Sequence, residues 1–149
     1  MGPGWKSRQL YAMMGWPESS AGTVAADAAA HGAMSNPRAI IAEDEPLLRD
    51  ELAEALGALW PELEIVAQVG DGISALCELE RKLPDVMFLD IQMPGLTGLD
   101  VARQANGRCH VVFVTAYDQH AIAAFEQGAA DYVLKPISAS RLATTVARL

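Results

Sequence analysis

The segment 85-DVMFLDIQMPGLTGLD-100 decides the fold, because an uninterrupted apolar run ends there on an acid, Asp90, and leads into a Pro-Gly loop. Similar apolar runs end on Glu43–Asp44, on Thr115 and on Lys135. Continuous apolar runs of this length, separated by stretches of helical length, are typical of parallel strands buried on both faces. Their final polar residues would meet at the carboxyl edge of the sheet, where open α/β sheets bind ligands.

From Arg38 onward, strand and helix patterns alternate. Predicted strands occupy residues 39–42, 65–69, 85–89, 110–114 and 131–134, and predicted helices occupy 46–59, 72–82, 98–105, 118–127 and 138–149. Pro46 suits a first helical turn, Asp71 and Ser138 can cap helices, and Pro84 can end one. Five β–α units with short connections predict an α/β fold, a doubly wound five-stranded parallel sheet with helices on both faces.

The 149 residues suit one domain, which we expect to span residues 38–149. Residues 1–37 are rich in Gly, Ala and Ser. We expect them to be a flexible N-terminal extension, a cloning remnant or a start upstream of a native Met34, although their aromatic residues leave a short docking helix open. Because the helical pattern reaches Leu149 without a cap or a polar tail, we expect the native protein to continue.

Composition excludes several function classes. The chain carries 11 Lys and Arg against 19 Asp and Glu, a net charge of -8. This charge argues against nucleic-acid binding by the domain itself, so any contact with DNA would need another domain. No apolar stretch approaches the roughly 18–20 residues of a membrane span. A signal-peptide pattern is also missing, so we expect a cytoplasmic protein without a membrane partner.

The cysteines and histidines give little support for a metal or redox site. Cys77 and Cys109 lack the spacing of a metal knuckle or redox pair, and we expect both to be reduced and buried. His31, His110 and His120 are scattered along the chain. We expect ordinary surface or strand-edge histidines rather than metal ligands or phosphohistidines.

The acids carry a more specific chemistry if the first and third strands are neighbours. Neighbouring strands lie about 4.8 Å apart, so Glu43, Asp44 and Asp90 would repel one another without a cation between them. Hard carboxylate oxygens favour Mg²⁺. A carboxylate can attack phosphorus, and the Lys135 ammonium and Thr115 hydroxyl could contact the phosphoryl oxygens. Taken singly, Asp90 and Thr115 could be turn or cap residues, and Lys135 a solvated strand end.

Three segments together resemble the receiver domain of two-component response regulators. They are 40-IIAEDEP-46, 86-VMFLDIQMPGLTGLD-100 and 111-VVFVTAYDQHAIAAFEQGAADYVLKPI-137. The resemblance covers essentially all of residues 38–149. It implies a flavodoxin-like sheet with strand order 2-1-3-4-5. It also implies that a sensor histidine kinase phosphorylates the domain, which is a phosphoacceptor that assists its own phosphorylation and dephosphorylation rather than an enzyme.

The resemblance also assigns roles to single residues. Asp90 is the expected phosphoacceptor, Lys135 the phosphate partner, and Thr115 and Tyr132 the switch residues. The expected ligands of Mg²⁺ (or Mn²⁺) are Glu43, Asp44, Asp90 and the main-chain carbonyl of Gln92. Many members have two aspartates where this chain has Glu43 and Asp44, so the longer side chain should shift metal affinity without abolishing binding. The bond between Lys135 and Pro136 is expected to be cis, and Tyr132 could instead be an ordinary strand aromatic.

Residues 115–137 are most similar to the LytTR-type (LytR/AlgR-like) subfamily. This implies control of transcription through a DNA-binding domain C-terminal to Leu149. We expect phosphorylation to remodel one face of the domain for formation of a homodimer or for release of the effector. The switching face would combine the helix at 118–127, the strand at 131–134 and the helix at 138–149. Ile122 and Phe125 on the first of these helices could belong to the core or to the dimer face, and the sequence leaves both open.

Two other functions compete with a phosphorylation switch. A Mg²⁺-dependent phosphatase or phosphotransferase could use the same aspartyl-phosphate intermediate. However, haloacid-dehalogenase-type enzymes need an acid two residues after the nucleophile, where this chain has Gln92. A flavodoxin-like cofactor carrier is disfavoured because the acidic loop at 43–46 would repel a flavin phosphate.

Overall fold

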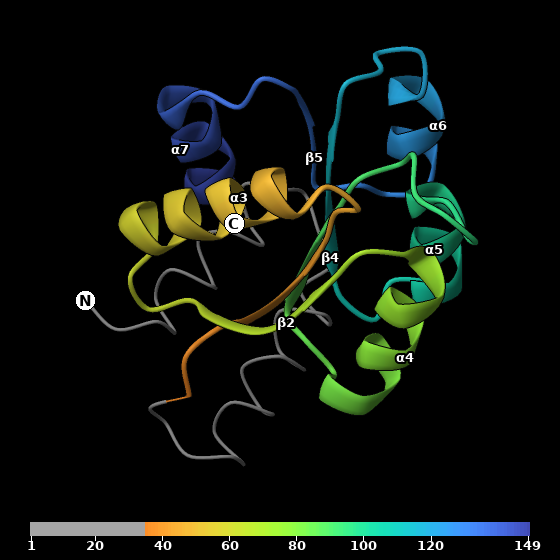
Figure 1. Cartoon of the computed structure of the whole chain (residues 1–149), viewed down its shortest axis with the longest axis horizontal. Coiled ribbons are helices and arrows are strands. Elements are labelled where there is room, and N and C mark those ends of the chain that lie inside the picture. Colours follow the sequence, from red (N-terminus) through yellow and green to blue (C-terminus); the bar gives the residue numbers. More distant parts are fainter. Residues whose placement is uncertain (1–34) are drawn as a thin grey trace.

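The computed structural model describes residues 35–149, so all but the last three residues of the expected extension at residues 1–37 lie outside the described residues. The strands are β1 (Arg38–Ala42), β2 (Glu64–Val69), β3 (Val86–Leu89), β4 (His110–Thr115) and β5 (Asp131–Leu134). The helices are α3 (Pro46–Leu59), α4 (Gly72–Lys82), α5 (Gly98–Ala105), α6 (Ala121–Glu126) and α7 (Ala139–Arg148). Strands and helices alternate as predicted (Figure 1).

The strands form one parallel sheet in the order β2-β1-β3-β4-β5. This order confirms the predicted flavodoxin-like arrangement. It places β1 beside β3 in the middle of the sheet, with Ala42 opposite Leu89. The last residues of these two strands therefore stand next to each other, and whatever follows them shares the same edge.

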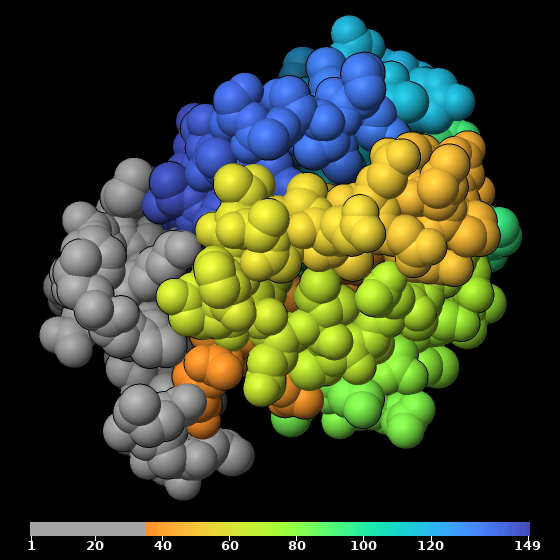
Figure 2. Space-filling view, turned by 60° about the vertical axis from the view of Figure 1, so that its left-hand side comes forward, coloured from red at the N-terminus to blue at the C-terminus, as the bar shows by residue number. Residues whose placement is uncertain are grey.

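Two apolar layers hold the helices against the sheet, because successive strand residues point to opposite faces. Ile40, Met87 and Phe113 lie in the layer beneath α4, α5 and α6. Ile41 and Phe88 lie in the layer beneath α3 and α7. Figure 1 shows these two sets of helices on opposite faces. Helix α3 also packs against α7, and the two lie side by side on the surface in Figure 2.

Local sequence signals explain the helix ends. Asp71 caps α4 by accepting a hydrogen bond from the Ser74 amide at 2.7 Å, and Ser138 caps α7, both as predicted. Pro46 lies in the first turn of α3. Helix α5 begins with a capping box, in which the Thr97 side chain and the Asp100 side chain each accept from the other residue's amide. We did not predict this capping box.

Helix α6 is shorter than predicted. It covers Ala121–Glu126 rather than residues 118–127. The Ala121 amide donates to the Asp118 carbonyl, so a turn occupies the first residues and the helix starts after it. The other boundaries differ from the prediction by one residue at most, including β4, which continues through Thr115.

The expectation that both cysteines are buried was wrong for one of them. Cys77 is exposed on α4, whereas Cys109 is buried just before β4, and both are free thiols. Burial raises the pKa of Cys109 to about 12, so its thiol is a weak nucleophile at neutral pH. Of the two positions expected for the histidines, surface or strand edge, His110 has the second, because it is buried as the first residue of β4. Within residues 35–149, no helix is long and apolar enough to cross a membrane.

A buried carboxylate attaches α7 to β5. Asp131 is 2% exposed and accepts hydrogen bonds from both terminal nitrogens of Arg141, at 2.8 and 3.0 Å, and from the Thr145 hydroxyl at 2.7 Å. Arg148 adds an ion pair at 3.2 Å. Burial opposes ionisation of Asp131, but hydrogen bonds from Arg141 and Thr145 outweigh it and lower its pKa. Because Arg141 also donates to the Tyr132 carbonyl, this network fixes the backbone of β5 relative to α7.

Candidate functional site

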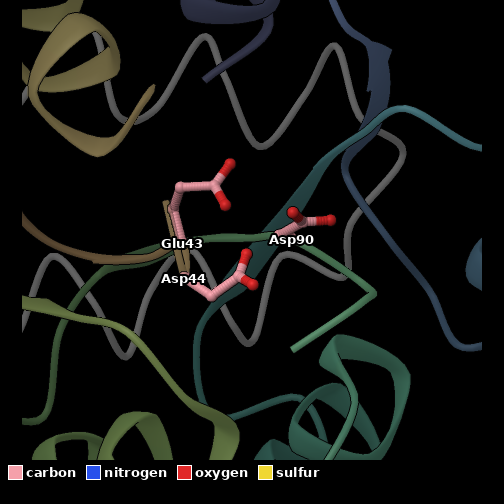
Figure 3. Close-up of side chains that lie close together, drawn as sticks. All are labelled: Glu43, Asp44 and Asp90. Carbon is pink, nitrogen blue, oxygen red and sulfur yellow. The ribbon is translucent and has the colours of Figure 1, made fainter. Parts of the chain in front are cut away.

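The acidic residues meet where β1 and β3 end. The Asp90 amide donates to the Ala42 carbonyl at 2.9 Å, and the Glu43 amide donates to the Val69 carbonyl at 2.9 Å. One carboxylate oxygen each of Glu43, Asp44 and Asp90 lies within 4.8 Å of the others. Figure 3 shows the three side chains grouped at the strand ends. The structure thus brings together the three acids that the sequence predicted to meet.

Lys135 reaches the same place from the end of β5. Its Nζ donates to Asp90 Oδ2 at 2.8 Å and also to Glu43 Oε1. Burial disfavours the ammonium charge, but the hydrogen bonds to the two carboxylates prevail and raise the pKa of Lys135. Lys135 is therefore a positively charged partner of both acids. Its peptide bond to Pro136 is cis, in agreement with the expectation.

One ammonium does not balance the acids of this pocket. Glu43 is buried, and burial raises its pKa. Lys135 opposes that shift, whereas Asp44 and Asp90 add to it, and the pKa of Glu43 reaches about 7. Three clustered carboxylate oxygens with surplus negative charge are a donor set that suits a hard divalent cation. The group of metal-capable side chains found within residues 35–149 contains no histidine or cysteine.

Thr115 and Tyr132 share a partner in the loop after β4. The buried Thr115 hydroxyl accepts a hydrogen bond from the Tyr117 amide at 3.4 Å. The Tyr132 hydroxyl donates to the Tyr117 carbonyl, and its ring lies 6.2 Å from the ring of Phe113. The Lys135 amide donates to the Thr115 carbonyl at 2.8 Å. A movement of the Thr115 side chain would therefore disturb its hydrogen bond with Tyr117. A shift of Tyr117 would in turn displace the acceptor of the Tyr132 hydroxyl.

The loop after Asp90 depends on a glycine that sequence reasoning missed. A Cβ atom at Gly98 would lie 2.2 Å from the Asp90 carbonyl oxygen, which is far inside contact distance. The Gly98 amide donates to the Ile91 carbonyl at 2.9 Å. The first turn of α5 therefore packs directly on the backbone of Asp90. A glycine right after the cap residue Thr97 is a signal that could have revealed this close approach.

Gln92 lies beside Asp90 through its backbone. Its amide donates to Asp90 Oδ1 at 3.3 Å, while its side chain is exposed. This hydrogen bond involves the amide of Gln92, so the predicted role of its main-chain carbonyl as a metal ligand stays a prediction.

Ile122 and Phe125 do not belong to the core. Ile122 is 76% exposed and Phe125 is 56% exposed on α6. Tyr117 and Leu134 are exposed as well. These four residues make up what we call the α6–β5 apolar face.

Comparison with known proteins places the chain in a family. The family model of the response regulator receiver domain matches residues 39–147, and the chain belongs to this family. An uncharacterized response regulatory protein of Vibrio cholerae is 51% identical over 114 residues, which are 74% of this chain and 44% of that protein. The transcriptional regulatory protein BtsR of Escherichia coli K12 is 41% identical over 114 residues, covering 75% of this chain and 47% of BtsR.

Solved structures agree with this result. The response regulatory domain of mrkE from Klebsiella pneumoniae has 36% identity and a TM-score of 0.72, covering 75% of this chain and 93% of that domain. The signal receiver domain of a response regulator named NarL from Mycobacterium tuberculosis has 32% identity and a TM-score of 0.68, over 75% of this chain and 94% of that one. The chain spans about half the length of the curated relatives that it matches. The predicted family and fold are confirmed, and the names of the relatives are those of regulators.

Proposed function

We propose that this receiver domain is a phosphorylation switch in which Asp90 accepts a phosphoryl group from a sensor histidine kinase. The observation that carries the proposal is the contact of Asp90 with the Lys135 ammonium inside a cluster of three carboxylates. An exposed surface aspartate has no such surroundings. The Lys135 ammonium, together with a cation held by the three carboxylates, would favour the close approach of a phosphoryl group.

In the proposed transfer, a carboxylate oxygen of Asp90 attacks the phosphorus of a phosphohistidine. The new P–O bond forms as the P–N bond breaks, and the histidine nitrogen keeps the electron pair and takes up a proton. Lys135 then moves from the carboxylate oxygen to a phosphoryl oxygen, which lies within reach because Nζ already contacts Oδ2. Thr115, at the end of the neighbouring strand β4, offers its hydroxyl to a second phosphoryl oxygen.

Mg²⁺ or Mn²⁺ would be held by Glu43, Asp44, Asp90 and the main-chain carbonyl of Gln92. When bound, the cation neutralises charge on the phosphoryl group. The grouping of three carboxylates around one ammonium supports this role, because a bound cation would offset the repulsion between the acids. Among the three carboxylate ligands, Glu43 has a longer side chain than Asp44 and Asp90.

The switch runs through the loop that Thr115 and Tyr132 share. If the Thr115 hydroxyl turns toward the phosphoryl group, it gives up its hydrogen bond with the Tyr117 amide. Tyr117 is then free to shift, and Tyr132, which donates to the Tyr117 carbonyl, repacks with it. Such a switch requires two states that differ by only a few kcal/mol. The changed surface would comprise α6, β5 and α7.

The α6–β5 apolar face supports a binding partner on this surface. All four of its side chains are exposed, and two of them, Tyr117 and Leu134, lie two residues after the switch residues Thr115 and Tyr132 in the sequence. We propose that phosphorylation makes this face bind a second copy of the domain, and that the homodimer activates an effector. Since BtsR is a transcriptional regulatory protein about twice as long as the match, we further propose a DNA-binding effector domain, of LytTR type, that follows this one in a cytoplasmic protein. The acidic receiver itself would not bind DNA.

Treatment with acetyl phosphate and Mg²⁺, followed by intact-mass analysis, tests the proposal. We expect one phosphoryl group on the parent, none on Asp90→Asn, and one on the control Asp50→Asn, which removes an exposed carboxylate of α3. Removal of Mg²⁺ with a chelator should abolish labelling. If Asp90→Asn is labelled as fast as the parent, the assignment is wrong. Turnover of many equivalents of a phosphomonoester would instead favour the phosphatase.

A further inference from the structure

An arginine of α3 holds the backbone of the acidic pocket. Arg49 Nη1 donates to the Glu43 carbonyl oxygen at 2.8 Å. The amide of Glu43 donates to the Val69 carbonyl at the end of β2, at 2.9 Å. Both the amide and the carbonyl of Glu43 are thus hydrogen-bonded. The carbonyl belongs to the peptide bond between Glu43 and Asp44. The pocket's two consecutive acids take their positions from this peptide.

Gly70 provides the space for that guanidinium. A Cβ atom at Gly70 would lie 3.0 Å from Arg49 Nη1, 3.8 Å from the Glu43 carbonyl oxygen and 3.9 Å from the Asp44 Cα atom. A methyl group there would push the guanidinium aside by a few tenths of an ångström, because the end of a long side chain gives way more easily than backbone. Gly70, just after β2, and Arg49, in the first turn of α3, therefore both lie next to the Glu43–Asp44 backbone between β1 and α3.

We propose that Arg49 is a positioning residue that holds the Glu43–Asp44 backbone in the geometry that binds the divalent cation, with Gly70 as the space it needs. This inference rests on the proposed function, since it assigns Arg49 to the same cation pocket. Arg49 touches no phosphoryl oxygen in this account. It acts on the metal ligands through the carbonyl of Glu43, as supporting residues of metal sites do.

Charge and position predict opposite effects for Arg49. A guanidinium beside a cation site repels the cation, so removing its charge should strengthen Mg²⁺ binding if charge were all that mattered. Loss of the hydrogen bond to Glu43 should instead loosen the ligand geometry and weaken binding. The sign of the change in affinity therefore separates the two roles, independently of phosphorylation.

The test is to measure the Mg²⁺ dissociation constant by isothermal titration calorimetry for the parent, Arg49→Gln and Gly70→Ala. Matched controls are Arg103→Gln, which removes an exposed arginine of α5, and Gly57→Ala, whose added methyl meets nothing within 4 Å on α3. We expect Arg49→Gln to bind Mg²⁺ about tenfold more weakly. Gly70→Ala should be weakened in the same direction, and both controls should match the parent.

A double variant makes the test more specific. Because Gln at position 49 is too short to meet the added methyl, Arg49→Gln/Gly70→Ala should bind Mg²⁺ no more weakly than Arg49→Gln alone. Unchanged or tighter binding by Arg49→Gln, or additive losses in the double variant, would overturn the proposal for Arg49. Failure of the parent itself to bind Mg²⁺ would instead overturn the proposed cation site, so the two failures are distinguishable.

Discussion

Replacement of Lys135 by glutamine tests how the acidic pocket balances its charge. The substitution keeps two N–H donors but removes the ammonium that contacts Asp90 and Glu43. At the 2.8 Å separation from Asp90 and an effective dielectric constant near 20, the Coulomb attraction that is lost amounts to about 6 kcal/mol. Desolvation of the buried ammonium offsets part of it, and breaking a buried ion pair costs roughly 3–5 kcal/mol in practice. Because Lys135 keeps 15% of its side-chain surface exposed, we expect the lower end, about 3 kcal/mol of unfolding free energy.

The unfolding free energy lost in Lys135→Gln should depend on pH in a direction that follows from the pKa of Glu43. The pKa of Glu43 is raised in the folded protein from 4.5 to about 7, so the folded state binds the extra proton between these values. The free energy of unfolding therefore falls as pH rises through this window. Without Lys135 the pKa of Glu43 should rise further, so Lys135→Gln should be most destabilised near about pH 8 and closest to the parent near about pH 5.

Urea unfolding with a chelator present, at these two pH values, measures the effect. Lys82→Gln on the last turn of α4 removes the same charge away from the pocket and serves as the control. Added Mg²⁺ should restore more stability to Lys135→Gln than to the parent, because the acids then lack any other cation. A Lys135→Gln protein within about 1 kcal/mol of the parent at the higher pH, or a gap that widens on acidification, would refute this account of the pocket.

Three further substitutions test other parts of the structure. Asp131→Asn should destabilise the domain by about 3 kcal/mol at neutral pH, because it leaves Arg141 without its carboxylate partner. The difference in unfolding free energy from the parent should shrink as pH falls through the lowered pKa of Asp131. Urea unfolding at neutral and acidic pH measures this difference, and a difference that does not change with pH would contradict the prediction. Gly98→Ala should lower the thermal midpoint and slow phosphorylation by acetyl phosphate, because the methyl group would collide with the Asp90 carbonyl, and a variant as stable and as fast as Gly57→Ala would contradict this. Tyr132→Phe should accept the phosphoryl group at the parental rate but lose phosphorylation-dependent dimerisation, measured by analytical ultracentrifugation, because it cannot bond to the Tyr117 carbonyl; unchanged dimerisation would remove Tyr132 from the switch.

The sequence predicted the fold well because buried strands can be recognised from short, continuous apolar runs. The runs before Glu43, Asp90, Thr115 and Lys135 are each long enough to identify a strand, and a polar residue marks where each ends. The meeting of the three acids then follows from one topological fact, the neighbouring positions of β1 and β3. That fact came from resemblance to a family, since periodicity alone does not order the strands of a sheet.

Contacts between distant segments were not predictable in the same way. The bond of Arg49 to the Glu43 carbonyl and the close approach of Gly98 to Asp90 depend on how helices pack at the sheet edge. The shorter α6 depends on a turn that competes with the helix at Asp118. Exposure of Ile122 likewise could not be read from its spacing, because an apolar residue on a short helix fits a core or a partner equally well.

Mapping the phosphoryl group onto the sequence would show whether Asp90 is the phosphoacceptor. After brief treatment with acetyl phosphate and Mg²⁺, sodium borohydride would reduce an aspartyl phosphate to homoserine, and tandem mass spectrometry of the digest would locate it. We expect conversion at Asp90 alone. Conversion at Glu43, at Asp44 or at any other carboxylate while Asp90 stays intact would contradict it.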